Sequence, residues 1–516
     1  MKNQPKCPKC GGLMVKGPRT KAGKIRWACG GANSVPYCYS TTNPNRPMRK
    51  ANGKAIVKAE PVKMRRSVAA KQRYIITAAQ NATPVHAEFF QCLQIAAEHM
   101  DAELIVVPIR YKNPTSRWSA SQEGDEIWDP AVVPYLFNQR KKLNANLVLL
   151  GDIKTQPTAA SPLTGFEGLT GGESCIIAHT KLQLKVVAAP SNKFPKILTT
   201  TGACTLRNYT DSRVGKLGEF HHVFGAALVE LDGKTFHLRQ LLGDSKDGSF
   251  TDLNKHYTVN GWEPAAPAAA LVLGDVHVGD TDPAVEHAIF GPNGLDRTVR
   301  PQRIAVHDLF NGAAVNPHIL KNPFAQHVRM RHGKQAVKRE VEAAIEWVRE
   351  RCGGRAVIVP SNHDDWLQRW LSSHDWRDDP FNAKFYLETA LAVLNAGDGE
   401  RSDAFAMIGR RMAPDLTWLN RDESLVAAGV ELGLHGDLGP NGSRGSRQNL
   451  RRIGVRTVIG HTHSPGIEEG CYQVGTSTHL NLSYNKGPSS WLQTCCIVYA
   501  NGKRTLVNFV SGNWRK

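Results

Sequence analysis

The stretch Leu271-Val272-Leu273-Gly274-Asp275-Val276-His277 decides the fold, because an apolar run ends directly in an aspartate and a histidine. The same arrangement occurs four more times. Apolar runs precede polar clusters at Arg303–Val306 (Asp308), Ala356–Val359 (Asn362-His363-Asp364), Leu432–Leu434 (His435) and Val455–Ile459 (His461-Thr462-His463). Runs of this length predict buried strands. We therefore expect five strand ends to bring their polar side chains together at one edge of a sheet.

The residue types at these strand ends indicate a site for two adjacent cations. Carboxylate and amide oxygens are hard ligands, and imidazole nitrogens are borderline ones, so the mixture suits divalent transition metals. The alternative is a set of unrelated loop histidines in an α/β domain. That alternative does not explain why each polar cluster directly follows an apolar run.

The order of the clusters resembles the calcineurin-like metallophosphoesterases, whose signature is D-x-H, G-D, G-N-H-D/E, H and G-H-x-H. In this chain the motifs stand as Gly274–His277, His307-Asp308, Ser361–Asp364, His435 and Gly460–His463, within residues 268–512. Two positions depart from the signature, since His307 and Ser361 replace glycines that ease tight turns. We expect local differences in the turns there.

The resemblance implies one metal site of Asp275, His277, Asp308 and His463, and a second of Asp308, Asn362, His435 and His461. Asp308 would bridge both ions. Two ions about 3.5–4 Å apart can activate a water and hold both oxygens of an in-line phosphoryl displacement. We expect manganese, with iron, zinc or magnesium as alternatives, because mixed Asp/His/Asn ligation disfavours calcium and an all-oxygen magnesium site.

Two further histidines are candidates for contact with the substrate. The resemblance assigns phosphate contact to His363, whose imidazole can stabilise developing charge or protonate a leaving oxygen. His318 follows Asp308-Leu309-Phe310-Asn311. In that position it is similar to a substrate-contacting histidine of the SbcD-type nucleases, and an ordinary loop histidine is the alternative.

Four cysteines near the N-terminus predict a structural zinc site. Cys7 and Cys10 form a C-x-x-C pair, and Cys29 and Cys38 supply two more thiolates for tetrahedral zinc. The segment resembles the zinc ribbons of DNA-handling proteins, although the spacing of its second pair is irregular. Free cysteines in a disordered tail and a protein-docking role are the alternatives.

The positive charge of the chain is concentrated in the same region. The formal net charge is +19, and residues 1–73 hold 18 lysines and arginines against a single acidic residue, Glu60. Basic residues beside aromatic ones suit a nucleic-acid backbone and exposed bases. The candidate contacts are Lys9, Lys24, Arg26, Trp27, Arg65 and Arg66. Acidic lipid is a weaker alternative, because no amphipathic helix accompanies the charge.

The predicted organisation has four parts: a zinc ribbon at 1–40, a basic linker at 41–73, an α/β accessory domain at 74–262 and a metallophosphoesterase domain at 268–516. The predicted fold class is α/β, with a two-layer β-sandwich flanked by helices in the last part. No apolar stretch is long enough to span a bilayer, and no secretory signal is present, so a cytoplasmic protein is expected. The sequence leaves room for a homo-oligomer.

These features predict a two-metal-dependent nuclease that hydrolyses DNA phosphodiester bonds and holds DNA with its basic arm. A phosphatase or small-nucleotide phosphodiesterase with a localisation arm is the alternative, and a non-enzymatic DNA-binding protein is a third. The complete ligand set argues against the third. The combination of ribbon and phosphoesterase is similar to DNA-degrading enzymes of bacteriophages, which would act in the host cytoplasm.

Overall fold

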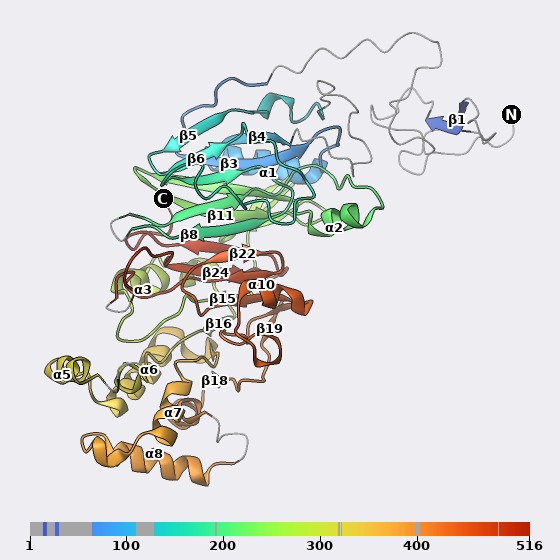
Figure 1. The fold of residues 1–516 in the computed structure, drawn as a ribbon. Coiled ribbons are helices and arrows are strands. Elements are labelled where there is room, and N and C mark those ends of the chain that lie inside the picture. The colour runs from blue at the N-terminus through green and yellow to red at the C-terminus, as the bar shows by residue number, and fades with distance from the viewer. Residues whose placement is uncertain are drawn as a thin grey trace.

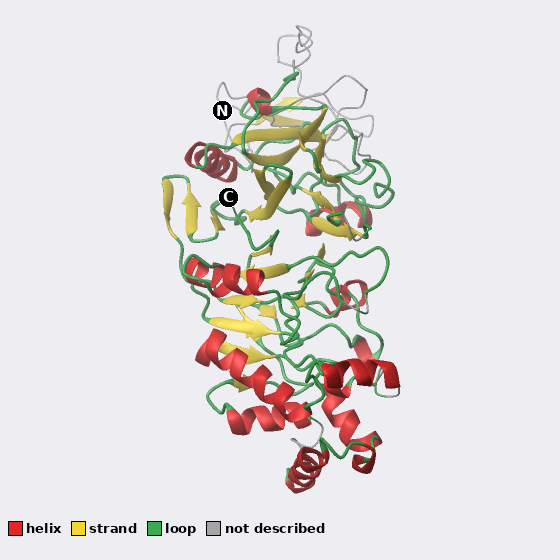
Figure 2. Ribbon diagram, turned by 90° about the vertical axis from the view of Figure 1, so that its left-hand side faces the viewer, coloured by secondary structure: helices red, strands yellow, loops and turns green. Residues whose placement is uncertain are grey.

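The computed structural model describes residues 14–17, 26–29, 64–109, 128–190, 193–317, 320, 322–397, 403–482 and 485–515. The described chain has an α/β architecture of several sheets, with most of its helices gathered at one end (Figures 1 and 2). Two short N-terminal strands, β1 (Met14–Gly17) and β2 (Arg26–Cys29), pair antiparallel. No helix within the described residues has the length and apolar character needed to cross a membrane.

A four-stranded sheet begins the middle part of the chain. Strands β3 (Arg73–Gln80) and β4 (Glu103–Ile109) are parallel and are joined by helix α1 (Ala87–His99). Strands β10 (Gly225–Asp232) and β11 (Thr235–Leu242) complete it in the order β11-β10-β3-β4. Helix α1 buries Phe89, Cys92 and Leu93 against the sheet, as its 3.6-residue spacing predicts. Strand, helix and strand alternate here, as expected for the predicted α/β class of this part.

A six-stranded sheet carries the first three polar clusters. Its order is β18-β17-β16-β15-β24-β25. The strands are β15 (Ala270–Val272), β16 (Arg303–Val306), β17 (Ala356–Ile358), β18 (Thr417–Trp418), β24 (Thr494–Val498) and β25 (Arg504–Asn508). Strands β15 to β18 run parallel, so their carboxyl ends meet at one edge. The β24–β25 hairpin turns at Asn501-Gly502, a dipeptide typical of tight hairpin turns, and Gly502 has a φ of +73°.

A ten-stranded sheet runs through both halves of the chain. Its order is β19-β20-β21-β23-β22-β8-β9-β7-β6-β5. The strands from the C-terminal half are β19 (Val426–Ala427), β20 (Val430–Glu431), β21 (Arg456–Ile459), β22 (Gly466–Glu468) and β23 (Cys471–Gln473). Those from the middle part are β5 (Arg140–Asn144), β6 (Leu147–Leu150), β7 (Ser174–Ile177), β8 (Gln183–Val187) and β9 (Lys196–Thr200). The two halves join where β22 pairs antiparallel with β8.

The hydrophobic core lies between these sheets and on the outer face of the six-stranded one. Val272, Ala305 and Val357 from the six-stranded sheet share one cluster with Val458 and Ile467 from the ten-stranded sheet. The opposite face packs against helices α3 (Pro283–Phe290), α4 (Leu295–Val299), α6 (Val337–Cys352), α7 (Asp365–Ser373) and α9 (Ala404–Met412). The apolar residues of the long helix α6 recur at helical spacing and form part of this core. Helices α5 (Pro323–Arg331), α8 (Ala383–Asn395) and α2 (Arg213–His221) and the three-stranded sheet β12 (Phe250–Asp252), β13 (Lys255–Thr258), β14 (Gly261–Pro264) complete the main elements.

Two expectations about the polar clusters need correction. Leu432–Leu434 is not part of a strand, because β20 ends at Glu431 and only single backbone hydrogen bonds follow, from the N–H of Leu432 to Leu425 and from the N–H of Gly460 to His435. The five clusters also do not share one sheet. The first three follow strands of the six-stranded sheet, whereas the last two follow β20 and β21 of the ten-stranded sheet. The site therefore lies where the edges of two packed sheets meet.

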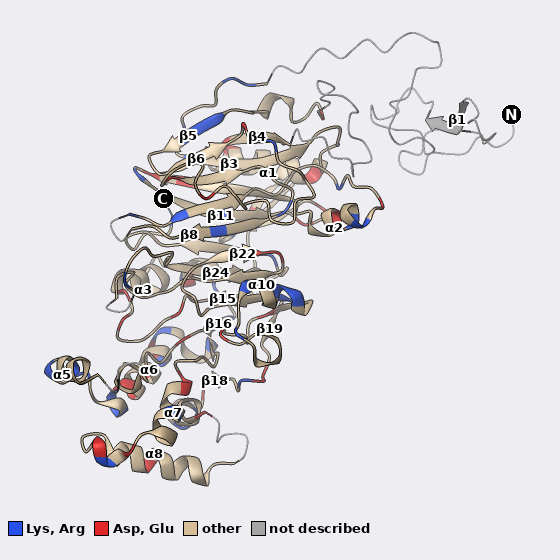
Figure 3. Cartoon of the chain, in the orientation of Figure 1, with Lys and Arg blue, Asp and Glu red and all other residues tan. Residues whose placement is uncertain are grey.

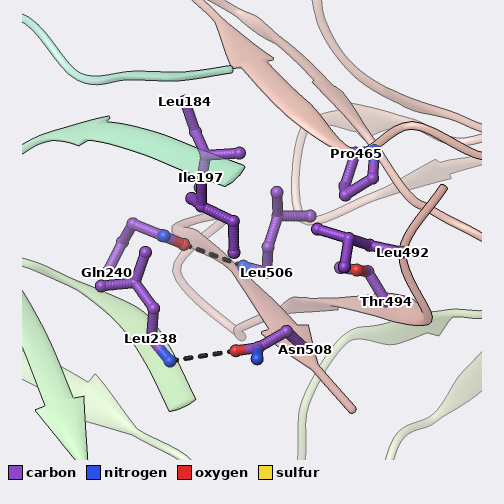
Figure 4. Close-up of a pocket in the computed structure, with 9 residues that line it drawn as sticks. All are labelled: Leu184, Ile197, Leu238, Gln240, Pro465, Leu492, Thr494, Leu506 and Asn508. Atoms are coloured by element: carbon purple, nitrogen blue, oxygen red, sulfur yellow. Dashed lines mark hydrogen bonds between the residues drawn. The ribbon is translucent and has the colours of Figure 1, made fainter. Parts of the chain in front are cut away.

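A small cavity lies between the middle part and the C-terminal hairpin (Figure 4). Leu184, Ile197, Leu238, Leu492 and Leu506 line most of it, and Gln240 and Asn508 bond across it to backbone N–H groups. The volume open to the centre of a water molecule is about 20 Å³. That volume holds roughly one water, so the cavity is a packing defect of the joined sheets and not a substrate site.

A buried ion-pair network stabilises the four-stranded sheet. Arg239 donates to both carboxylate oxygens of Asp252 at 2.7 and 3.0 Å and to Glu230 at 2.6 Å. Arg73 donates to the other oxygen of Glu230 at 3.0 Å. Burial opposes the charged form of Glu230, but the two guanidinium groups outweigh it and lower the pKa of Glu230 below its ordinary value. The network therefore stabilises the fold only while its carboxylates are charged.

We predict that Arg239→Met lowers the free energy of unfolding by about 3–5 kcal/mol, because it leaves buried carboxylates without their main partner. Denaturant unfolding followed by tryptophan fluorescence measures the change. Since the pKa of Glu230 is lower in the folded protein, the wild-type advantage is complete at neutral pH. It is lost as pH falls through the folded pKa of Glu230. Lys338→Met is the control, because Lys338 forms an exposed pair with Glu342 and should leave stability unchanged. An equal effect of both substitutions would contradict the prediction.

Candidate metal centre

Five loops bring all seven predicted metal ligands together. Asp275 and His277 follow β15, Asp308 follows β16, and Asn362 follows β17. His435 follows β20, and His461 and His463 follow β21. Asp275, His277, Asp308, His435 and His463 are all buried. The parallel strands and the contact between the two sheets explain why residues so far apart in sequence share one site.

The first predicted ligand set forms a compact group. The Nε2 atoms of His277 and His463 lie 3.0 Å apart. His277 Nε2 lies 3.4 Å from Oδ2 of Asp308, and His463 Nε2 lies 3.4 Å from Oδ2 of Asp275. One donor atom from each of Asp275, Asp308 and His463 lies within 4.8 Å of the other two, which is close enough for one metal ion to contact all three.

The second predicted ligand set shares Asp308 with the first. Oδ2 of Asp308 lies 3.3 Å from Nε2 of His435. Oδ1 of Asn362 lies 3.2 Å from Nε2 of His435 and 3.0 Å from Nδ1 of His461. One carboxylate oxygen is thus in contact with a histidine from each set. Asp308 has the position that the resemblance implies for a bridging ligand.

These separations match ligands arranged around a common ion. Donor atoms at about 2.1 Å from one metal ion lie roughly 3.0–3.4 Å from each other, in octahedral or tetrahedral arrangements. Both carboxylate oxygens of Asp275, and Oδ1 of Asp308, are buried and make no hydrogen bond of ordinary geometry within the described residues. Buried carboxylate oxygens are costly without a cation or a donor. The donor set therefore fits two divalent ions.

The backbone at the ligands is strained. His277, Asp308, His461 and His463 have φ values of +47°, +46°, +82° and +58°. Residues other than glycine rarely adopt this left-handed region, and each instance costs of the order of 1 kcal/mol or more. Four predicted ligands adopt this conformation. The interactions of their side chains at the site must therefore compensate for the strain in the backbone.

The electrostatics of the site favour a bound cation. Burial and the neighbouring charge of Asp308 raise the pKa of Asp275 well above its ordinary value. Burial also lowers the pKa of His277, and that of His463 to about 3, so both imidazoles are in the neutral form that binds metals. Burial opposes a charged His435, but Asp308 and Asp275 outweigh it and raise its pKa to about 9. The carboxylates therefore need a positive charge, which either a proton on His435 or a cation supplies.

His363 lies beside the ligands and is held by two contacts. Its Nδ1 lies 2.8 Å from the carbonyl oxygen of Asn311, which leaves Nε2 facing away from that bond. Its ring stacks on Trp366 at 3.8 Å and meets the ring of His277 at 4.4 Å. One donor atom from each of His277, Asp308 and His363 lies within 4.8 Å of the other two. His363 is therefore close enough to reach a group bound between the ligands.

The two departures from the family signature leave the turns intact. Ser361 donates from its backbone N–H and from its hydroxyl to Asp364 at 2.9 and 3.0 Å, which closes the turn before Asn362. His307 is buried, and its Cβ lies beside position 460. A Cβ at position 460 would lie 2.2 Å from Oδ1 of Asp275, so glycine is required there. The lack of space for a side chain next to Asp275 therefore explains Gly460, the glycine of the G-H-x-H motif.

Sequence reasoning missed several residues around the site. Asn311, whose carbonyl oxygen contacts His363, has one sequence signal, its position three residues after Asp308. Trp491, whose ring lies 4.2 Å from that of His463, has no sequence signal. Arg421 also has none, although it bonds to acids beside two of the ligand loops.

Several predicted residues lie elsewhere. His318, Cys7, Cys10, Cys38, Lys9 and Lys24 are outside the described residues. Arg26, Trp27 and Cys29 lie in β2, and their side chains are not described. Arg66 is exposed, whereas Arg65 pairs with Glu103 next to β4 and so is already engaged within the protein. Val68 is buried and belongs to the hydrophobic core.

A scan of the sequence against models of known protein families finds no match. Protein A1 of Escherichia phage T5 is 32% identical over 463 residues, which cover 86% of this chain and 83% of A1. A probable rhamnogalacturonate lyase C of Emericella nidulans is 25% identical over 193 residues, covering 32% of this chain and 18% of the lyase. The solved structure of Chaetomium thermophilum Vps29 aligns with 35% of this chain and 94% of its own, at 10% identity and a TM-score of 0.20.

The match to protein A1 is both long and well above chance similarity, and it confirms the expected relationship to bacteriophage proteins. The chain belongs to the family of protein A1 of Escherichia phage T5.

Proposed function

We propose that the protein is a two-metal-dependent nuclease of the calcineurin-like metallophosphoesterase type, which hydrolyses DNA phosphodiester bonds. The observation that carries this proposal is the position of Asp308. Its Oδ2 lies 3.4 Å from His277 of one ligand set and 3.3 Å from His435 of the other. One shared carboxylate between two histidine-containing sets is the arrangement that a pair of ions requires. The two packed sheets around it suit the two-layer sandwich of that superfamily.

The residues of the site divide into binding and reacting groups. Asp275, His277 and His463 would hold one ion, and Asn362, His435 and His461 the other, with Asp308 between them. Two bound divalent ions, with manganese preferred, would supply an activated water and neutralise phosphate charge. The buried ligands exclude bulk water from this point, which strengthens every charge interaction there.

His363 has the geometry of a proton donor or phosphate contact. The Asn311 carbonyl accepts from Nδ1, so that nitrogen carries the proton and the ring orientation is set. The other nitrogen, Nε2, lies on the opposite side of the ring, where it can stabilise charge on a phosphate or, in the charged form of the ring, protonate the leaving oxygen. Stacking on Trp366 keeps the ring from rotating away.

The charge distribution supports nucleic acid as the substrate. Residues 1–73 contribute +17 of the +19 net charge. In the rest of the chain, basic and acidic residues are interspersed (Figure 3). A small phosphoester needs no separate basic arm, whereas a DNA backbone gains affinity by releasing counterions. The arm, with one zinc ion on Cys7, Cys10, Cys29 and Cys38, is therefore proposed to hold DNA, in the cytoplasm of an infected cell.

The first prediction concerns the bridging carboxylate. Asp308→Asn removes the charge that both ligand sets share, so DNA hydrolysis should fall to background even at saturating manganese. The melting temperature should change little, because the side chain lies at a strand end. Asp296→Asn, the same change in an ion pair remote from the site, should retain activity. Turnover at the wild-type rate in Asp308→Asn would refute the shared-ion assignment.

The second prediction separates the reacting histidine from the ligands. His363→Ala should lower turnover by about 10²–10⁴-fold, the usual contribution of a positioned acid or base, without loss of metal. His435→Ala and His461→Ala should each lose about one ion per protein. Elemental analysis after gel filtration gives the metal content, and steady-state kinetics gives turnover. If all three variants lose metal equally, His363 is a ligand and its proposed role is wrong.

The third prediction concerns the arm. Deletion of residues 1–63 stops before Val68, which is buried, so the remaining protein should fold. DNA affinity should fall, and its dependence on salt should become less steep, because fewer phosphate contacts release counterions. Hydrolysis of a small chromogenic phosphodiester should persist, since every proposed ligand of the two-ion site lies beyond residue 270.

Cys7→Ser with Cys10→Ser serves as the matched variant, because zinc modules of this size rarely fold without metal. It should reproduce part of the defect while leaving the charge of the arm in place. If the truncated protein binds and cleaves DNA like the full chain at every salt concentration, the arm does not hold substrate. A phosphatase or small-nucleotide phosphodiesterase would then be the better proposal.

A further inference from the structure

Arg421 joins two loops of the site from outside the ligand set. It lies in the turn between β18 and β19, and its side chain is about three-quarters buried, with 25% exposed. Nη2 donates to Oδ2 of Asp365 at 2.7 Å, and Nη1 donates to Oδ1 of Asp437 at 2.9 Å. We call this three-residue group the Asp365–Arg421–Asp437 bridge.

Each end of the bridge is next to a ligand of the same proposed ion. Asp365 begins helix α7, three residues after Asn362. Asp437 is two residues after His435. Oδ1 of Asn362 and Nε2 of His435 lie 3.2 Å apart. The bridge therefore connects the loop of Asn362 with the loop of His435, whose ligand atoms must contact the same ion. One loop follows the six-stranded sheet and the other follows the ten-stranded sheet.

The turn that carries Arg421 is itself held in place. Arg410 from α9 donates to the side-chain oxygen of Asn420 at 2.6 Å and to the carbonyl of Trp418 at 3.2 Å. Asn420 donates from its backbone and side chain to Glu423 at 2.9 and 3.0 Å. The guanidinium of Arg421 thus starts from a fixed position and does not move freely with either loop.

The chemistry of the bridge requires arginine. A planar guanidinium presents several donors in fixed directions, so it can bond two carboxylates at once, whereas a lysine ammonium is a point charge. Without Arg421, Asp365 and Asp437 would be two like charges facing each other, and Asp437 is only 10% exposed. Repulsion would then push the Asn362 and His435 loops apart.

We propose that Arg421 is a positioning residue that sets the distance between Asn362 and His435 and thereby the affinity of the second metal site. This inference rests on the two-ion assignment of the proposed function. Arg421 does not touch the reacting groups. It acts by holding ligands from two sheets at the separation that one ion needs. Partners of this kind that orient metal ligands contribute about 10–100-fold to metal affinity.

The test is calorimetric titration of the metal-free full-length protein with Mn²⁺, together with elemental analysis at limiting Mn²⁺. Wild type should bind two ions. Arg421→Met should bind the second ion about 10–100-fold more weakly and retain the first. Its activity should require correspondingly more Mn²⁺ for half-maximal turnover and should rise toward wild type at saturation. Arg421→Lys keeps the positive charge but loses the planar guanidinium with its several donors. Its affinity for the second ion should therefore lie between those of wild type and Arg421→Met.

Arg355→Met is the matched control. Arg355 makes a similar two-point pair with Asp296 at 2.6 and 3.1 Å, but it precedes β17 whereas Asn362 follows it. This variant should lose stability without any change in Mn²⁺ affinity. Asp365→Asn, which weakens one end of the bridge, should shift the second Mn²⁺ affinity in the same direction as Arg421→Met.

The outcomes separate the two proposals. If wild type binds no pair of ions, the two-metal function fails, and the role of Arg421 fails with it. If wild type binds two ions and Arg421→Met binds both with unchanged affinity, only the role of Arg421 is overturned. If Arg421→Met does not fold, Arg421→Lys and Asp365→Asn decide, and wild-type Mn²⁺ affinities in both would overturn the inference.

Discussion

The burial of two carboxylates, Asp275 and Asp308, in one small volume is the constraint on which the rest of the site depends. Each would be costly alone, and burial, together with the charge of Asp308, raises the pKa of Asp275 well above its ordinary value. Burial lowers the pKa values of His277 and His463 and keeps both neutral, whereas Asp308 and Asp275 outweigh burial and raise the pKa of His435 to about 9. Such an arrangement is stable when cations neutralise the carboxylates. The same requirement accounts for ligand atoms 3.0–3.4 Å apart and for four ligands in left-handed backbone conformations.

Much of this could be predicted from the sequence, because the signals are local. Apolar runs followed by Asp, Asn or His gave the ends of β15, β16, β17 and β21, and Asn501-Gly502 gave the final hairpin. The alternation of side chains along a strand predicts that adjacent Cys495 and Cys496 point to opposite faces, and they lie in two different cores. The ligand assignments came from the family resemblance, and the structure brings those residues together in the implied sets.

The remainder could not be predicted, because it depends on contacts between distant segments. Nothing in the two-residue strand β20 indicates that it ends at Glu431, nor that its sheet continues through β22 into β8. Arg421 lies in a loop and has no sequence signal. Its role is evident only from the structure, in which it bonds to both Asp365 and Asp437. The sequence also could not predict that the ligands come from two sheets. An apolar pattern predicts a strand but does not predict the strand with which it pairs.

The shared sheet changes the interpretation of the middle part of the chain. Residues 74–262 looked like a separate accessory domain in the sequence, yet β8 pairs with β22, which begins three residues after His463. Side chains reinforce this pairing: Gln183 donates to Glu468 at 2.8 Å, and the buried Lys181 pairs with Glu469 at 2.9 Å. Without β8, the backbone of β22 would lose its partner on that side and the loop of His461 and His463 its support. The middle part therefore stabilises one half of the ligand set, and the chemistry proposed for the C-terminal half depends on the packing of both.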